Sequence, residues 1–177
     1  MFNSLFDGAP VDIMQMLDAR ERRAHTQQQL LEQFNPCVLV SITLNIPGPV
    51  KNSEAITTVF ASVISELDEA LLPFEKLQQE DFSLPTGMEF YRVLRADALD
   101  VKRACSEFEE GHSLGRLLDI DVVEMAGETP TPISRTALGM PPRRCFICNE
   151  DAKVCARSRR HTVLEMQEHI ARMIAIY

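Results

Sequence analysis

Two aspartates separated by a single residue form the first group in this sequence whose types and spacing suggest chemistry. Asp119 and Asp121 lie in the apolar stretch LLDIDVVEM, residues 117–125. In a β-strand, residues two apart point to the same side, so the two carboxylates would share one face. Paired carboxylates repel unless a cation lies between them, and Mg²⁺ is held by one or two carboxylates plus phosphate oxygens. The pattern predicts a magnesium site for phosphoryl chemistry; the alternative is a solvent-facing pair without function.

The residues just before the pair suit a ligand that carries phosphate. Gly111 and Gly115 would let the backbone approach a ligand closely, and His112 and Ser113 could form hydrogen bonds to it. The order Gly-x-Ser followed by Asp-x-Asp on a strand resembles the active-site signature of nucleotidyltransferases. In that signature glycine and serine are adjacent, whereas here His112 separates them.

Three cysteines and a histidine form a second group, within RRCFICNEDAKVCARSRRH, residues 143–161. Cys145, Cys148, Cys155 and His161 have the spacing C-x2-C-x6-C-x5-H. Three thiolates and one imidazole make a sensible tetrahedral Zn²⁺ site. The spacing matches no common zinc finger, so free thiols buried in a tight turn remain the alternative.

The same segment concentrates positive charge in an acidic chain. Six of the 18 basic residues lie between residues 143 and 160, although the net charge is −8. Arginine binds phosphate oxygens in pairs, and a helix beginning at Thr162 would add a favourable dipole. The segment predicts a local anion site, with a solvated basic face as the alternative. The net negative charge argues against nonspecific binding to nucleic acid.

A turn after an apolar strand forms a third candidate site. In LNIPGPVKNSE, residues 44–54, the Pro-Gly-Pro turn around Gly48 ends a strand and presents Lys51 before a helix that begins near Ser53. Lys51 and the free N–H groups at that helix end could hold a phosphate or a ribose. The alternative is a rigid turn with an exposed lysine.

The periodicity of apolar residues predicts the elements that must hold these groups. Helical spacing predicts helices over residues 11–34, 53–72, 97–109 and 162–177. Alternation predicts strands over residues 37–46, 88–95 and 117–125, with ISRTAL (133–138) as a fourth strand in a hairpin with the third. The polar segment 73–87 is predicted to be a loop. This order predicts an α+β fold with one mixed sheet of about four strands packed against helices.

Length and composition favour a single domain over residues 1–177. The chain has 45% hydrophobic and 25% charged residues, which is ordinary for a soluble globular protein. Its apolar runs fall short of the roughly 20 residues that a membrane span needs. The start, MFNSLFDGAP, lacks the pattern of a secretion signal, so a cytoplasmic location is expected. Five cysteines without such a signal argue against a disulfide framework.

Three segments together resemble one protein family. LNIPGPVKNSE, GHSLGRLLDIDV with PISRTALG, and RRCFICNEDAKVCARSRRH resemble the apo-citrate lyase phosphoribosyl-dephospho-CoA transferases, also called holo-citrate lyase synthases. The likeness runs from ARERR, residues 19–23, to the final helix. It implies an enzyme that takes triphosphoribosyl-dephospho-CoA and transfers its phosphoribosyl-dephospho-CoA part to a serine of the acyl carrier (gamma) subunit of citrate lyase, releasing diphosphate. Nucleic acid and membrane are not implied as partners.

The resemblance also suggests roles for the residues singled out above. Asp119 and Asp121 would hold Mg²⁺ against the triphosphate, and one of them would help to deprotonate the incoming serine. The residues expected to neutralise phosphates are Arg116, Arg143, Arg144, Arg157 and Arg159. The residues expected to contact other parts of the precursor are Asn45, Gly48, Lys51, His112, Ser113 and Gly115. The rival interpretation is a non-enzymatic, zinc-stabilised module that binds an acidic partner protein through the cysteine segment.

Overall fold

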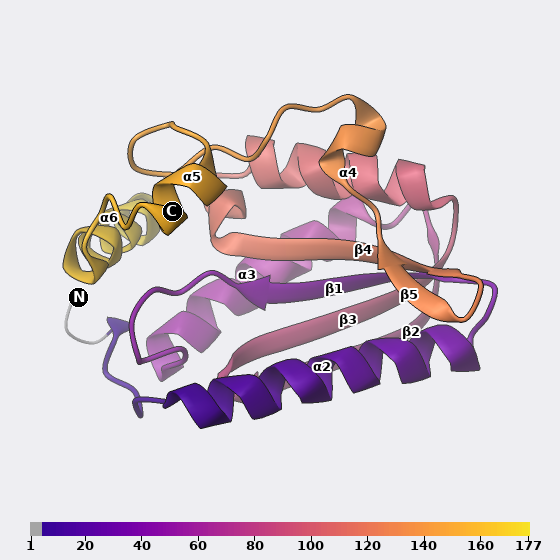
Figure 1. Ribbon diagram of the computed structural model, residues 1–177, viewed down its shortest axis with the longest axis horizontal. Coiled ribbons are helices and arrows are strands. Elements are labelled where there is room, and N and C mark those ends of the chain that lie inside the picture. The colour runs from indigo at the N-terminus through magenta and orange to yellow at the C-terminus, as the bar shows by residue number, and fades with distance from the viewer. Residues whose placement is uncertain (1–4) are drawn as a thin grey trace.

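The computed structural model describes residues 5–177, which fold around one five-stranded sheet (Figure 1). The strands are β1 (Val38–Leu44), β2 (Glu75–Leu84), β3 (Gly87–Arg95), β4 (Leu118–Ala126) and β5 (Thr129–Pro132). Their spatial order is β2-β3-β1-β4-β5, and every pairing in this sheet is antiparallel. The predicted α+β class is confirmed. The sheet has five strands rather than about four, and it is antiparallel rather than mixed.

Helices cover both faces of the sheet and one of its ends. The long helix α2 (Ile13–Gln33) runs along one face, whereas α3 (Glu54–Ala70) and α4 (Ala98–Gly111) lie on the other (Figure 1). The short α5 (Ala152–Arg157) and α6 (Val163–Ile176) gather where β1 ends and β4 begins. Two 3₁₀ turns, η1 (Gly115–Leu117) and η2 (Arg135–Leu138), flank β4 and β5. Within residues 5–177, every helix is too short or too polar to cross a lipid bilayer.

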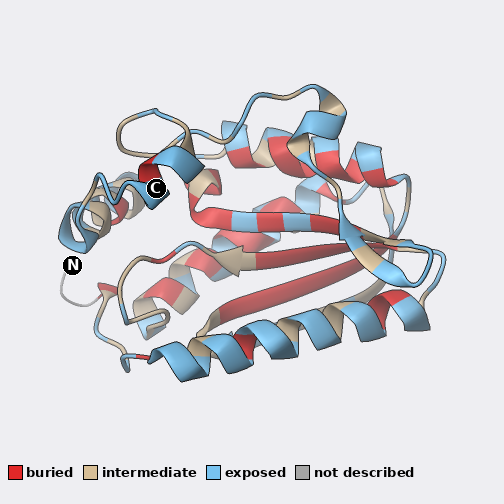
Figure 2. Cartoon of the chain, in the orientation of Figure 1, coloured by how far each residue is buried: buried red, intermediate tan, exposed pale blue. Residues whose placement is uncertain are grey.

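The central strands divide the apolar core into two layers. The larger cluster lies under α3 and α4 and takes Val40 and Ile42 from β1, with Ile120 from β4. The smaller cluster lies under α2 and includes Leu39 and Val123. Figure 2 shows that burial is concentrated on β1, β3 and the inner sides of the helices. Because strand residues alternate, the α2 face of the sheet also carries the polar positions of β1 and β4.

Most predicted elements are confirmed within a few residues, but the segment 73–87 was wrongly predicted to be a loop. Residues 75–84 form the edge strand β2, which pairs with β3 along its length. Its sequence, EKLQQEDFSL, shows no apolar alternation, and every residue in it stays at least partly exposed. An edge strand pairs with a neighbour on only one side. The strand conformation of β2 is therefore stabilised by its hydrogen bonds to β3 rather than by burial of its own side chains.

The predicted strand at ISRTAL is also wrong. The hairpin after β4 exists, but its second strand is Thr129–Pro132, reached through a tight turn with Gly127 at φ +66°. Ser134 then caps the 3₁₀ turn over residues 135–138 by accepting a hydrogen bond from the N–H of Ala137. The serine favours a cap over a strand, because its hydroxyl can satisfy a backbone donor at a helix start.

The Pro-Gly-Pro turn after β1 packs against α6. Gly48 has φ +91°, and a Cβ placed on it would lie 2.9 Å from Nε2 of Gln167 and 3.0 Å from Cγ1 of Val163. The same Gln167 Nε2 donates a hydrogen bond to the carbonyl of Pro47 (3.1 Å). Gly48 therefore fixes the approach of α6 to the end of β1.

Replacing Gly48 by alanine is expected to lower the free energy of unfolding by about 1–3 kcal/mol, because a side chain at positive φ is strained and would press on α6. Urea denaturation measures this. The matched control is Gly111→Ala at the end of α4, where an added Cβ meets nothing within 4 Å. Equal stability of the two variants would contradict the packing role of Gly48.

Candidate functional site

The two aspartates of β4 share the face covered by α2, as their spacing predicted. Asp119 lies opposite Thr43 of β1, and Asp121 lies opposite Ser41. The residues that alternate with them are buried on the other face of the strand. The carboxylates are thus held on a rigid strand near the end of the sheet that α5 and α6 border.

A third carboxylate lies on the same face, on strand β3. Glu89 faces Thr43 from the side opposite Asp119, and it is only 2% exposed. It accepts hydrogen bonds from Nη2 of Arg22 (2.7 Å) and Nη1 of Arg23 (3.1 Å), both in α2. Sequence reasoning missed Glu89, although a glutamate inside the apolar strand MEFYRVLR was an available signal. The ARERR segment therefore serves to anchor α2 on the acidic face of the sheet.

Arg143 closes the open edge of β4. Its guanidinium donates to Oδ1 of Asp119 (3.1 Å) and to the carbonyls of Leu118 and Arg116, and it pairs with Oε1 of Glu109 (3.3 Å). Strand β5 pairs with β4 only from residue 123 onward, so among residues 5–177 the edge formed by residues 118–122 has no strand neighbour. Side chains instead satisfy the free carbonyls there.

Glu109 of α4 is the hub of this cluster, and sequence reasoning missed it. Its side chain is 5% exposed and accepts a hydrogen bond from Nη1 of Arg135 (2.9 Å) in addition to its pair with Arg143. Nearby, Nζ of Lys102 donates to the carbonyl of Ile120 (3.0 Å). Burial raises the pKa of the Glu109 carboxyl, and the surrounding cations, Arg143 first, partly offset this.

Two further groups near β4 have shifted pKa values. Loss of hydration raises the pKa of Asp121, and the negative charge of Asp119 raises it further, although Asp121 itself is exposed. Loss of hydration lowers the pKa of Arg116, and repulsion from Arg143 adds to this effect. Each of the two groups would gain from a counter-charge: a cation beside the aspartates and an anion beside the arginines.

A cavity of about 720 Å³ lies between β1, the segment 143–161 and the start of α6; we call it the arginine cavity. Four of the five arginines predicted to bind phosphate line it, as does Asn45: Arg116, Arg143, Arg144 and Arg159. Nε of Arg116 is buried and has no hydrogen-bond partner among the described residues. Converging guanidinium groups with an unsatisfied donor suit an anion such as phosphate.

A smaller cavity of about 220 Å³ adjoins Asp119, and Asn45 lines both cavities. Lys51 and Arg23 also line the smaller one. The ammonium group of Lys51 donates to the carbonyl of Ile46 (2.7 Å), and burial lowers its pKa. The structure therefore brings the predicted residues Asn45 and Lys51 close to the aspartate pair, together with arginines of α2 that were not predicted.

Other predicted ligand residues lie away from these two cavities. His112 stacks on Phe108 (ring centroids 4.8 Å apart), and its Nε2 is 3.2 Å from Oε2 of Glu66 in α3. Neither His112, Ser113 nor Arg157 lines the arginine cavity or the smaller one. Their expected contacts with substrate have no support in the geometry.

The glycines and the start of α6 have structural explanations. A Cβ on Gly115 would lie 2.6 Å from the carbonyl oxygen of Phe108, so this glycine lets η1 pack against α4. A capping box begins α6: Thr162 accepts from the N–H of Glu165, and the Glu165 carboxylate accepts from the N–H of Thr162. These hydrogen bonds lower the pKa of Glu165. The N-terminus of α6 already holds a carboxylate and is less available to an outside anion.

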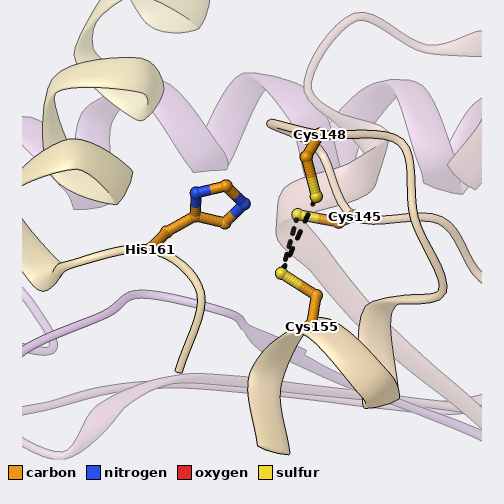
Figure 3. Close-up of side chains that lie close together, drawn as sticks. All are labelled: Cys145, Cys148, Cys155 and His161. Carbon is orange, nitrogen blue, oxygen red and sulfur yellow. Dashed lines mark hydrogen bonds between the residues drawn. The ribbon is translucent and has the colours of Figure 1, made fainter. Parts of the chain in front are cut away.

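The three cysteines and His161 converge at the border of the arginine cavity (Figure 3). One ligand atom from each residue lies within 4.8 Å of all the others. The Sγ atoms of Cys145 and Cys155 are 3.6 Å apart, and those of Cys148 and Cys155 are 3.8 Å apart. The segment thus brings together two groups that sequence reasoning treated separately, the candidate zinc ligands and the phosphate-binding arginines.

Comparison with known proteins identifies the family. The model of the family described as apo-citrate lyase phosphoribosyl-dephospho-CoA transferase matches residues 11–177. A Streptococcus pyogenes serotype M18 protein named "probable apo-citrate lyase phosphoribosyl-dephospho-CoA transferase" is 40% identical over 97% of this chain and 90% of its own length. The Shigella boydii serotype 18 protein named apo-citrate lyase phosphoribosyl-dephospho-CoA transferase is 38% identical over 88% of this chain and 84% of its own.

A longer relative contains the same unit as a part. Protein CitXG of Leuconostoc mesenteroides subsp. cremoris is 36% identical over 94% of this chain, which spans 36% of that protein. The residues matched by the family model, 11–177, include both aspartates, the cysteine segment and the last helix. The chain therefore belongs to the apo-citrate lyase phosphoribosyl-dephospho-CoA transferase family.

Proposed function

We propose that this protein is a cytoplasmic enzyme that transfers the phosphoribosyl-dephospho-CoA group of triphosphoribosyl-dephospho-CoA to a serine of the acyl carrier (gamma) subunit of apo-citrate lyase. Family membership supports transfer of this group to apo-citrate lyase. The proposed location of the reaction rests on Arg143, whose side chain lines the arginine cavity and donates a hydrogen bond to Asp119 (3.1 Å). One side chain thus joins the cationic cavity to the acidic strand.

The reaction requires few groups from the protein. The serine hydroxyl of the carrier attacks the phosphorus attached to the ribose; the bond from that phosphorus to the diphosphate oxygen breaks, and a phosphodiester forms. The arginine cavity would hold the phosphate chain and stabilise the negative charge that grows on the departing diphosphate. Asp121, which lies beside Asp119 on the same face of β4, would act as the general base and accept the proton of the serine hydroxyl.

The aspartate pair fits a magnesium ion. Both carboxylates offer hard oxygen ligands from one face of a strand, and the side chain of Asp119 is 57% exposed. The mutual repulsion that raises the pKa of Asp121 is the effect that a bound cation would relieve. A magnesium ion there would neutralise phosphate charge, while Arg143 would orient Asp119 from the opposite side.

A direct test combines the protein with apo-citrate lyase acyl carrier subunit, Mg²⁺ and triphosphoribosyl-dephospho-CoA. Intact-mass analysis of the carrier should show an increase equal to the mass of the phosphoribosyl-dephospho-CoA group. A carrier whose acceptor serine is replaced by alanine should keep its mass. An unmodified wild-type carrier after incubation with folded enzyme would refute the proposed function. Omission of Mg²⁺ tests the metal separately.

Replacing Arg116 by glutamine is expected to reduce kcat/KM for the triphosphate substrate by about 10- to 100-fold, because one hydrogen bond to a charged group contributes about 1.5–3 kcal/mol. The effect should appear mainly in KM if Arg116 binds the phosphates equally in the ground and transition states. Steady-state kinetics with varied precursor gives both constants.

Arg157→Gln is the matched control for Arg116→Gln. Arg157 belongs to the basic segment 143–160, but it is exposed and does not line the arginine cavity. Its replacement should leave kcat/KM nearly unchanged. Equal losses in the two variants would mean that overall charge, rather than the cavity, attracts the substrate.

A further inference from the structure

The segment that builds the arginine cavity has almost no apolar core of its own. From Glu124 to His169 the only buried residue is Cys155, at 6% exposure. The segment is nevertheless folded: the N–H of Cys145 donates to the carbonyl of Glu150 (2.7 Å), and the side chain of Asp151 caps α5. Small units that bury little apolar surface usually depend on a disulfide or a metal ion for stability.

The sulfur positions match a tetrahedral metal site. With a Zn–S bond of about 2.3 Å, two thiolates of a tetrahedral site lie about 3.8 Å apart. The two Sγ–Sγ distances given above, 3.6 Å and 3.8 Å, agree with this value. A disulfide would need a separation of about 2.05 Å, and all five cysteines are free.

His161 provides an independent observation. Its Nε2 atom is buried and makes no hydrogen bond to any residue in the described part of the chain. Figure 3 shows its ring directed toward the three sulfurs. A buried ring nitrogen without a partner is costly, and a bond to a metal would satisfy it.

The turn between the first two cysteines is shaped to present both sulfurs to one point. The N–H of Ile147 donates to Sγ of Cys145 (3.4 Å), and Asn149 reverses the chain after Cys148 at φ +60°. Asparagine tolerates this left-handed conformation better than most residues. The third sulfur comes from the middle of α5, and the imidazole comes from the residue before the cap of α6.

We propose that Cys145, Cys148, Cys155 and His161 bind one Zn²⁺ ion in a closed structural site. Four protein ligands complete the tetrahedron, so the ion has no open position for catalysis. Its task is to hold the backbone next to Arg144 and Arg159, each of which lies within two residues of a ligand and lines the arginine cavity. The proposal concerns folding of this segment, and it stands whether or not the proposed transfer reaction is correct.

The metal content of purified protein tests the proposal. Under reducing conditions, the wild-type protein should carry about one zinc ion per chain by inductively coupled plasma mass spectrometry. Cys148→Ser should carry little zinc. Cys37→Ser and Cys105→Ala should keep it, because these two cysteines lie elsewhere, just before β1 and in α4. Folded, reduced wild-type protein without zinc, or with stoichiometric iron instead, would overturn the proposal.

A pair of changes at His161 tests the ligand set without depending on loss of folding. His161→Ala should weaken zinc retention during dialysis against a chelator, whereas His161→Cys should restore it, because four thiolates also form a tetrahedral zinc site. Cobalt-substituted protein should show the visible bands of a tetrahedral ion and thiolate charge-transfer bands. The spectrum of His161→Cys should change as a fourth sulfur joins. An unchanged spectrum in both variants would exclude His161 as a ligand.

Discussion

Replacement of Asp121 by asparagine is expected to lower kcat/KM for carrier modification on the order of 10³-fold. The change removes one carboxylate of the proposed magnesium pair and the proposed base together, while keeping the shape of the side chain. Intact-mass time courses of the carrier subunit measure the rate. Glu124→Gln, a neutralised carboxylate on the same strand but on the opposite face from Asp119 and Asp121, should keep nearly full activity.

The pKa of Asp121 adds a second expectation to this prediction. Because its pKa is raised in the folded protein, the ionised form destabilises the fold at pH values above that pKa. The Asp121→Asn change removes this effect, so the unfolding temperature near neutral pH should stay the same or rise slightly. Without Mg²⁺ the pKa of the Asp121 carboxyl should lie above that of an ordinary aspartate, and added Mg²⁺ should lower it. A large loss of stability in Asp121→Asn would show that the activity loss arises from unfolding.

Replacement of Glu109 by alanine is expected to lower the free energy of unfolding by about 3 kcal/mol, the lower end of the range for breaking a buried ion pair. Without this carboxylate, Arg135 and Arg143 lie close together with their main counter-charge removed. The side chains of these arginines are 15% and 23% exposed, which supports the lower figure. Urea unfolding followed by circular dichroism measures the change.

Glu110 is the natural control for Glu109. It is adjacent in α4 and also pairs with Arg135, but its side chain is 49% exposed. Glu110→Ala should change the unfolding free energy by no more than about 0.5–1 kcal/mol. If the two alanine variants were equally stable, the ion pairs of Glu109 would contribute no more than the exposed ion pair of Glu110.

The pH dependence of this cluster follows from the raised pKa of Glu109. A carboxyl whose pKa is higher in the folded state than in the unfolded state binds its proton more tightly when folded. The stability gained from this tighter proton binding is therefore present at low pH. It is lost as pH rises from the ordinary pKa of a glutamate through the raised pKa of Glu109. In Glu109→Gln this part of the pH dependence should disappear.

Apolar periodicity was sufficient to predict most of the fold. Strand β1 has an apolar residue at every second position from Val38 to Leu44, and α3, α4 and α6 each have an apolar stripe, so these periodicities predicted their type. Strand β2 could not be found in this way, because it buries little and is specified by hydrogen bonds to β3. The antiparallel arrangement of the strands could not be predicted from the sequence either, because strand pairing depends on contacts between distant segments.

The candidate site was predictable where its residues are close in sequence. The spacing of Asp119 and Asp121 alone placed them on one face, and the four candidate zinc ligands lie within a short segment. Glu109 gave no local signal, because its partners Arg135 and Arg143 lie more than twenty residues away. His112 is a different case: its place between two glycines suggested a ligand, whereas in the structure its ring stacks on Phe108 and contacts Glu66.

The two outer strands bear on how a partner protein can approach. Strand β2 carries charged residues along its free edge and has an irregularity between Lys76 and Gln78, whereas β5 contains Pro130 and Pro132, which lack an N–H donor. Such edges resist the addition of a foreign strand. Recognition by backbone pairing, in which a ligand extends the sheet, is therefore disfavoured at both margins. The proposed carrier subunit would then be recognised through side chains, so charge and shape at the mouths of the two cavities would determine selectivity.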